Sequence, residues 1–137
     1  MTIRTLLAVS AFLAATPALA GLAQDAVLAR YAAEAKTADP GFTGFSAKRG
    51  KALFHAKFAT GKPDTPSCTT CHTENPKQEG RTRAGKIVPP LALSVKADRY
   101  SDFAETEKWF GRNCDSVIGR TCTPVEKGDF ISYMITQ

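Results

Sequence analysis

The distribution of apolar and polar positions along the chain predicts helices and no strand of useful length. An alanine-rich segment over residues 24–36 predicts a first helix, because alanine has the highest intrinsic helix propensity. A second helix is predicted over residues 46–58, where Ser46 can cap its start. The apolar stripe of this second helix, at helical spacing, consists of Ala47, Gly50, Phe54 and Phe58.

Two further helices are predicted in the C-terminal third of the chain. Asp102 followed by Glu105 has the spacing of a capping box, and the helix that it opens is expected to end at Gly111. The segment TPVE over residues 123–126 is another helix start, with proline in the first turn. One face of this last helix contains Gly128, Ile131, Met134 and Ile135. Since there are no repeats and no low-complexity segments, the pattern predicts a single all-α domain.

Residues 1–20 have the features of a signal peptide. Arg4 is followed by an apolar run and by the tripeptide Ala-Leu-Ala at 18–20, the small-x-small pattern that signal peptidase recognises. A membrane anchor is the alternative, but the run is shorter than the roughly 20 residues that span a bilayer, and Pro17 interrupts it. No second apolar stretch is long enough to span. We therefore expect residues 21–137 to form one soluble domain that is exported to the periplasm.

Composition and charge exclude several classes of protein. Hydrophobic residues make up 43% of the 137 residues and charged residues 23%, which is typical of a globular protein and not of a disordered or fibrous one. Lys and Arg number 18 against 13 Asp and Glu, so the formal net charge is +5. The positive charges are dispersed among acidic residues in a chain that is expected to be exported, so nucleic acid is not an expected partner.

Residues 68–72 read CTTCH, the C-x-x-C-H signal for attachment of c-type haem. A thioredoxin-like redox pair also uses C-x-x-C, but it needs no histidine and lies in a βαβ context that is missing here. A zinc site would need a second ligand pair at similar spacing, whereas the other two cysteines are eight residues apart. The sequence predicts one covalent haem c, attached through Cys68 and Cys71, with His72 as the proximal iron ligand. The long polar loop over residues 73–99 is expected to wrap this cofactor.

Several segments resemble one group of haem proteins. A G-x-x-x-F helix (Gly50 and Phe54), the C-x-x-C-H sequence, a long loop with prolines and a last helix containing Tyr133 are similar to a class I cytochrome c. The closer match is in GKPDTPSCTTCH (61–72), VPPLA (88–92), DRYSD (98–102), EKWFGRNC (107–114) and VIGRTCTPVEK (117–127). Together these resemble the sphaeroides haem protein (SHP) family, a high-spin branch of the class I cytochromes. The resemblance implies a class I cytochrome c-like fold around the haem, in which the terminal helices cross at the glycine.

The second axial position of the iron has no obvious ligand. Met134 is the only methionine left after the expected cleavage, and it lies on the apolar face of the last helix, where packing is its expected role. His55 is about 100° from the apolar stripe of its helix, so solvent exposure is expected. An ordinary low-spin electron carrier with His55 or Met134 as sixth ligand is the alternative function.

Asn113 is the candidate for this position. It is expected in a loop after the helix that contains Trp109, and the resemblance to SHP implies that its side chain coordinates the ferric iron. An amide oxygen is a hard, neutral donor that suits Fe(III) better than Fe(II), so reduction would release it and open a site for a diatomic. The alternative is that Asn113 is only a turn residue, since Gly-Arg-Asn-Cys is typical of turns.

Further candidate residues surround these ligands. Cys114 and Cys122 are expected to form a disulfide in the periplasm, stabilising the fold by about 2.5 kcal/mol. The disulfide either crosslinks a loop or limits and redox-couples the movement of Asn113. The family usually has a proline carbonyl that accepts the hydrogen bond of the proximal imidazole; Pro90 matches that proline and Pro89 is the alternative. Candidates for the haem propionates or the pocket lining are Arg81, Arg83, Tyr100 and Trp109.

The resemblance implies an exported monohaem cytochrome that accepts electrons, becomes five-coordinate on reduction and binds a diatomic such as O2 or NO. Its implied electron donors are a dihaem cytochrome c and a membrane cytochrome b. The sequence does not separate a gas-binding protein from an enzyme that consumes oxygen or nitric oxide. No catalytic residue is predicted, because no acid–base pair beside the iron is identifiable.

Overall fold

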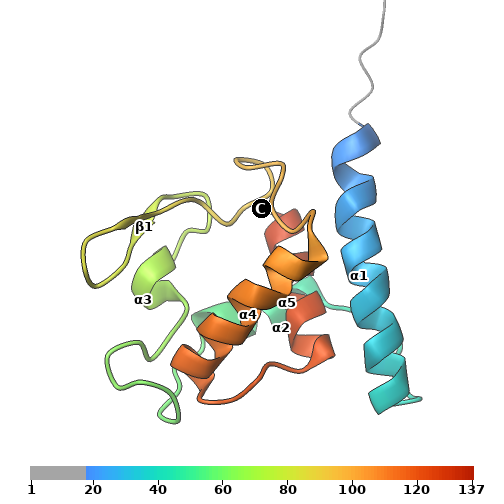
Figure 1. Cartoon of the computed structure of the whole chain (residues 1–137), viewed down its shortest axis with the longest axis horizontal. Helices are drawn as coiled ribbons and strands as arrows, with labels where there is room; N and C mark the ends of the chain where they lie inside the picture. Colours follow the sequence, from blue (N-terminus) through green and yellow to red (C-terminus); the bar gives the residue numbers. More distant parts are fainter. Residues whose placement is uncertain (1–17) are drawn as a thin grey trace, which may run out of the picture.

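The computed structural model describes residues 18–137, which form five helices and a short β-hairpin (Figure 1). Helices α1 to α5 are Ala18–Ala38, Ala47–His55, Thr69–His72, Phe103–Ile118 and Pro124–Ile135, and strands β1 and β2 are Gly80–Arg81 and Ile87–Val88. The expected all-α fold is confirmed. Most of the expected signal peptide falls on residues 1–17, outside the described part of the chain. From residue 18 onward, no helix has the length and apolar character needed to cross a membrane.

Helix α2 crosses α5 at Gly50. A Cβ atom at Gly50 would collide with the carbonyl oxygen of Asp129, so only glycine lets the two backbones approach this closely. The Asp129 carboxylate accepts the backbone N–H of Ser46 at 2.6 Å and two N–H groups of Arg49 at 2.6 and 2.8 Å. The Ser46 hydroxyl caps α2, as expected, by accepting the Arg49 N–H. The crossing at glycine implied by the class I resemblance is therefore present, although α1 precedes it.

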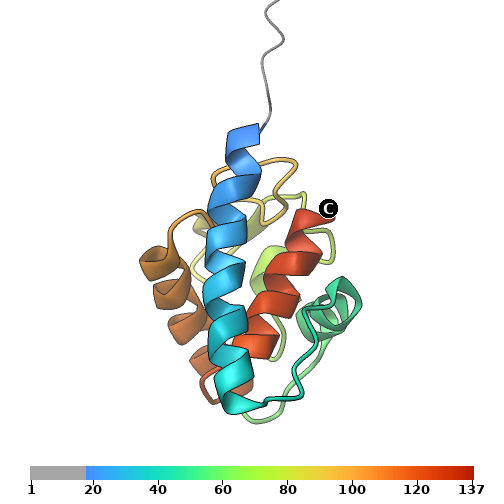
Figure 2. The ribbon, with the colours of Figure 1, turned by 90° about the vertical axis from the view of Figure 1, so that its right-hand side faces the viewer.

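Helix α1 lies along α4 and α5 (Figure 2). The helix is longer at both ends than the predicted helix over residues 24–36. Tyr31 of α1 is fully buried; it packs in a cluster with Val27 and Ile131 and donates a hydrogen bond to Glu107 of α4 at 2.6 Å. This helix closes one side of the core.

The apolar face of α5 differs in one residue from the predicted face. Met134 is fully buried in a cluster with Phe54, Leu91 and Tyr133, which agrees with its expected packing role. Ile135, predicted on this face, is 36% exposed, whereas Tyr133 is only 5% exposed. The Tyr133 ring packs against Phe54 of α2, with ring centroids 6.0 Å apart, and this contact selects the buried face.

Two predicted helix ends are wrong. Helix α2 ends at His55 and not at Phe58, because the N–H of Phe58 bonds to the Pro66 carbonyl at 2.7 Å. Helix α4 continues past Gly111 and ends at Ile118, followed by the C-cap Gly119 with a left-handed φ of 77°. Its start is as predicted, since the Asp102 side chain accepts the N–H of Glu105. The added turns bury Cys114, Val117 and Ile118. This burial outweighs the cost of about 1 kcal/mol for a glycine inside a helix.

The loop over residues 73–99 is held against α3. Its hairpin pairs Gly80 with Val88, and a Cβ atom at Gly80 would collide with the carbonyl oxygen of Cys71. Further along the loop, the N–H groups of Leu91 and Ala92 both bond to the Pro76 carbonyl, at 2.8 and 3.0 Å. The long loop is therefore packed beside the haem-attachment sequence.

A matched pair of glycine substitutions tests the crossing. Gly50→Ala should lower the free energy of unfolding by about 1–3 kcal/mol, because the added methyl group forces α2 and α5 apart. Gly111→Ala should raise it by about 0.5–1 kcal/mol, because Gly111 is inside α4 and a Cβ atom there meets no other atom within 4 Å. Denaturant unfolding of the haem-loaded variants measures both. A Gly50→Ala variant that is as stable as the parent would show that the crossing does not depend on Gly50.

Candidate haem site

A cavity of about 620 Å³ lies between α3, the loop over residues 73–99 and α4. This volume is within the roughly 300–1,000 Å³ that is usual for ligand sites. Cys68, Cys71, His72 and Asn113 all line it. Its apolar lining includes Leu53, Leu91, Phe110, Val117, Ile118 and Phe130. An apolar cavity with two thiols and an imidazole at its surface fits a covalently attached haem.

Helix α3 is a single turn that sets the spacing of the attachment residues. The N–H groups of Cys71 and His72 both bond to the Cys68 carbonyl, at 3.3 and 3.2 Å. The turn stops at Thr73, whose φ of 60° is uncommon for a residue other than glycine. The thiols of Cys68 and Cys71 are not joined to each other. Both sulfur atoms are therefore available for thioether bonds.

Burial sets the protonation states of this segment. Burial, together with the nearby charge of Arg99, lowers the pKa of His72 to about 4, so its imidazole is neutral at pH 7 and keeps a lone pair for a metal. Burial also raises the pKa of the Cys68 thiol to about 11. A thiol rather than a thiolate at neutral pH is the reverse of what a thioredoxin-like nucleophile requires.

Asn113 lies in α4, which corrects the prediction that it is in a loop. The reason is the continuation of α4 past Gly111, which places Asn113 in a regular helical backbone. The face of α4 that lines the cavity has helical spacing and consists of Glu105, Thr106, Trp109, Phe110, Asn113, Cys114, Ser116, Val117 and Ile118. Asn113 thus lies on the cavity face of a rigid element rather than in a flexible turn.

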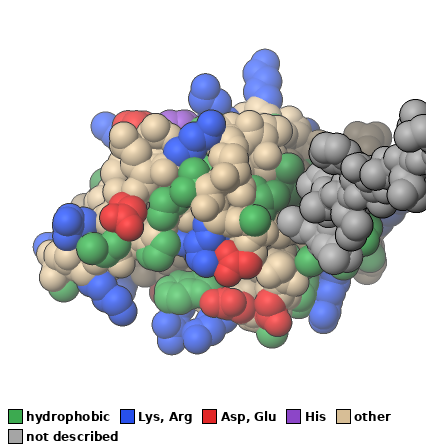
Figure 3. All heavy atoms as spheres, turned by 90° about the horizontal axis from the view of Figure 1, so that it is seen from above, with side chains coloured by type: hydrophobic (Ala, Val, Ile, Leu, Met, Phe, Trp, Pro, Cys, Tyr) green, Lys and Arg blue, Asp and Glu red, His purple; other side chains and the backbone are tan. Residues whose placement is uncertain are grey.

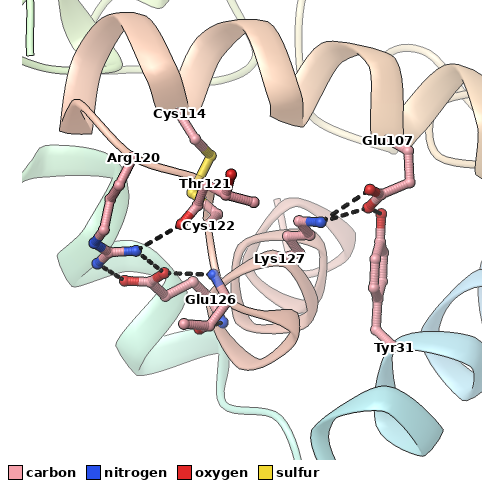
Figure 4. The surroundings of a disulfide bond; sticks show 9 residues. Tyr31, Glu107, Cys114, Arg120, Thr121, Cys122, Glu126 and Lys127 are labelled. Atoms are coloured by element: carbon pink, nitrogen blue, oxygen red, sulfur yellow. Dashed lines mark hydrogen bonds and ion pairs between the residues drawn. A yellow bond between two sulfur atoms is a disulfide. The ribbon is translucent and has the colours of Figure 1, made fainter.

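Figure 4 shows two links that join α4 to α5 and to the segment before it. In the sequence of α4, their residues Glu107 and Cys114 lie on either side of Asn113. Cys114 is joined to Cys122 by a disulfide with the Cα atoms 5.7 Å apart. On the other side, the Lys127 ammonium donates to both Glu107 oxygens at 2.7 and 3.0 Å. Burial raises the pKa of Glu107, but hydrogen bonds from Lys127 and Tyr31 outweigh burial and hold that pKa below its usual value.

The start of α5 is stabilised beside the disulfide. The predicted helix start at Thr123 is confirmed, and Thr123 and Glu126 form a capping box, in which each side chain accepts the backbone N–H of the other residue. The Arg120 guanidinium binds both oxygens of Glu126, at 2.8 and 2.7 Å. The segment that contains Cys122 is therefore fixed at both ends.

The two residues of the alternative ligand set do not line the cavity. Met134 is enclosed in the core cluster. The side chain of His55 is 29% exposed, and its Nδ1 lies 2.7 Å from a carboxylate oxygen of Glu74. Of the residues that the sequence proposes for the second axial position, only Asn113 shares the cavity with His72.

The proline carbonyls that the sequence proposes as partners of His72 are bound by Arg99. Its Nε donates to Pro90 at 2.9 Å and a terminal nitrogen donates to Pro89 at 2.9 Å. Arg99 lines the cavity, yet sequence reasoning did not single it out. Its hydrogen bonds depend on the folding back of the loop, and no local pattern indicates them.

Of the four residues predicted to contact the haem propionates or to line the pocket, two line the cavity and two do not. Tyr100 and Trp109 line the cavity, and the Tyr100 hydroxyl donates to the Leu91 carbonyl at 3.1 Å. Arg81 and Arg83 do not line it: Arg81 donates to the Gly85 carbonyl, and Arg83 pairs with Asp64. Cationic side chains at the cavity that could meet propionates are instead Lys86, Lys96 and Arg99.

These features define a class I c-type cytochrome: the haem-attachment turn, the crossing of α2 and α5 at Gly50, and the apolar cavity beside the attachment turn. The family described as Domain of unknown function (DUF1924) matches residues 40–134. The chain is 50% identical over 124 residues to the cytochrome c-type protein SHP of Cereibacter sphaeroides, covering 90% of this chain and 92% of that protein. It therefore belongs to the SHP family of c-type cytochromes, whose haem is covalently bound.

A second relative and two solved structures agree with this assignment. Cytochrome c'' of Methylophilus methylotrophus is 34% identical over 139 residues, covering 100% of this chain and 96% of that protein. The structure described as oxidized SHP, an oxygen binding cytochrome c, superposes with a TM-score of 0.76 at 47% identity, covering 83% of this chain and 96% of that one. Oxidized cytochrome c'' from Methylophilus methylotrophus gives 0.73 at 32% identity, with coverages of 85% and 95%.

The link between Glu107 and Lys127 predicts a pH-dependent stability. Glu107→Gln leaves the buried Lys127 without its counterion and should lower the free energy of unfolding at pH 7 by about 1–3 kcal/mol, since Glu107 is itself partly exposed. Because the pKa of Glu107 is lowered in the folded state, its contribution is present above the unfolded-state value of about 4.3 and is lost as the pH falls through the folded-state value.

The difference between parent and Glu107→Gln should therefore shrink as the pH falls below about 4, when measured by denaturant unfolding across a pH series. Glu79→Gln, at an exposed glutamate of the loop, is the control. A difference that is independent of pH would contradict the assigned ion pair.

Proposed function

We propose that the chain is a periplasmic monohaem cytochrome that accepts an electron and then binds a diatomic such as O2 or NO. The observation that carries this proposal is the cavity in which His72 and Asn113 are the proposed axial residues. The single C-x-x-C-H sequence supports one haem. Residues 1–20 as a cleaved signal peptide and 21–137 as one domain are part of the same proposal.

The residues have distinct roles toward the haem. Cys68 and Cys71 hold it through thioether bonds, and neutral His72 is the proximal ligand. When bound, the haem supplies one-electron redox chemistry and an iron that takes diatomic ligands in its reduced state. Pro90, or Pro89 in its place, accepts the N–H of His72 through its carbonyl oxygen and thereby orients the ring.

Asn113 is the distal ligand in the oxidised protein under this proposal. Its amide oxygen is a neutral hard donor, so its affinity falls when the iron gains an electron. Because α4 is held by Glu107–Lys127 on one side and by Cys114–Cys122 on the other, release of Asn113 takes place by rotation of its side chain and not by movement of the helix. The freed amide can then donate a hydrogen bond to a diatomic in the cavity.

The descriptions of two related structures support this proposal. The SHP structure is described as that of an oxygen binding cytochrome c. A solution structure of cytochrome c'' from Methylophilus methylotrophus is described as giving insights into haem-ligand detachment; it has a TM-score of 0.71 at 33% identity and covers 83% of this chain and 93% of that one.

Electron donors are proposed from the family resemblance: a dihaem cytochrome c and a membrane cytochrome b. Figure 3 shows Lys and Arg side chains spread over the upper face of the molecule, with acidic side chains between them. A dispersed pattern of this kind is suited to transient docking more than to one strong electrostatic interface.

Replacement of Asn113 tests the ligation. The oxidised spectrum of Asn113→Ala should change toward a five-coordinate or water-bound form, while its reduced form should bind CO as the parent does, because Asn113 has already left the iron. Asn75→Ala, at the only other asparagine of the chain, should change neither spectrum. Asn113→Met should give a low-spin reduced spectrum without a CO shift. An unaltered oxidised spectrum for Asn113→Ala would show that another residue is the ligand.

Removal of the disulfide tests whether it is only a crosslink. In Cys114→Ser/Cys122→Ser the free energy of unfolding should fall by about 2.5 kcal/mol, because the unfolded chain regains the entropy of the closed loop. The oxidised spectrum and CO binding should be those of the parent, since Glu107–Lys127 still holds α4. Altered ligand binding at unchanged fold would instead assign the disulfide a part in the release of Asn113.

A further inference from the structure

The guanidinium of Arg99 fixes two consecutive carbonyl groups beside the haem cavity. Its Nε donates to Pro90 and a terminal nitrogen donates to Pro89, both at 2.9 Å. Arg99, Pro89 and His72 all line the cavity. A planar fork with two donors holds such a pair of acceptors more rigidly than a single donor does.

The backbone of Arg99 is fixed independently of its side chain. Gln24 of α1 is 1% exposed, and its Nε2 donates to the carbonyl of Ala97 at 3.0 Å and to that of Arg99 at 2.8 Å. The proline segment is tied down next to Pro90, where the N–H of Leu91 bonds to the Pro76 carbonyl at 2.8 Å. The guanidinium therefore links two segments of the loop whose backbones are both anchored, and it has one defined position.

The carbonyl oxygen of Pro90 or Pro89 can accept hydrogen bonds from two donors at once. A carbonyl oxygen has two lone pairs, so one can accept from Arg99 and the other from the N–H of His72. A cationic donor withdraws electron density from that oxygen and weakens it as an acceptor for the imidazole. The imidazole then carries less negative charge and donates less density to the iron, which favours the reduced state. The positive charge of Arg99 favours the same state.

We propose that Arg99 is a positioning residue for His72, which holds and polarises the proline carbonyl that accepts the imidazole N–H and thereby raises the reduction potential of the haem. The inference rests on the proposed role of the proline carbonyl, and it is the same for Pro90 and Pro89 because Arg99 binds both. The effect acts through His72, so it is separate from the ligation by Asn113.

Charge-removing variants of the haem-loaded protein test this role by redox titration. Arg99→Gln should lower the equilibrium constant for one-electron reduction about tenfold, a shift of 59 mV to more negative potential. Arg81→Gln removes the same charge from an arginine that only donates to the Gly85 carbonyl outside the cavity, and it should change the constant less than threefold. Resonance Raman of the reduced proteins should show a higher iron–histidine stretching frequency in Arg99→Gln and an unchanged one in Arg81→Gln.

Arg99→Lys separates positioning from charge and serves if Arg99→Gln does not fold. It keeps the positive charge but lacks the rigid fork that holds both carbonyls, so the stretching frequency should rise while the potential changes less than in Arg99→Gln. Equal potentials in Arg99→Gln and Arg81→Gln, or an unchanged stretching frequency in both Arg99 variants, would overturn the proposal. A reduced parent protein that fails to bind CO would count against the proposed function alone, because the potentials are measured without CO.

Discussion

The close crossing of α2 and α5 at Gly50 is the constraint on which the rest of the structure depends. Three other parts of the structure attach to α5. Helix α1 packs on it through Ile131, α4 is joined to it through Lys127, and the loop after α3 bonds to it where the N–H of Leu93 meets the Met134 carbonyl at 3.1 Å. Because backbone-to-backbone contact fixes the position of α5, the surfaces that carry the two proposed axial residues have a defined separation.

The sequence predicted those features whose causes are local. Helix starts at Ser46, Asp102 and Thr123 depend on side chains that bond within three residues, and all three are confirmed. The attachment of haem depends on a five-residue sequence and was predicted for the same reason. The end of α4 at Gly111 was predicted wrongly, because the preference of glycine for a helix end is weaker than the burial gained by continuing to Ile118.

Long-range polar contacts could not be predicted in this way. The bonds of Arg99 to the proline carbonyls and of Gln24 to the loop join residues whose proximity arises only after folding. An arginine in a polar loop gives no signal of its future partner, so Arg81 and Arg83 were as plausible as Arg99. The family resemblance implies Asn113 as a ligand across the iron from His72, and the structure places both residues in the lining of one cavity.

The helical position of Asn113 has a consequence for affinity. Under the proposed ligation, an amide on a rigid helix stays within reach of the iron after it is released, so an external diatomic would compete with a tethered amide at high effective concentration. The apparent dissociation constant then equals the intrinsic one divided by the fraction of molecules in which the amide has rotated away. Under this proposal, residues that change this fraction, such as those packed around the Asn113 side chain, would tune gas affinity without contacting the gas.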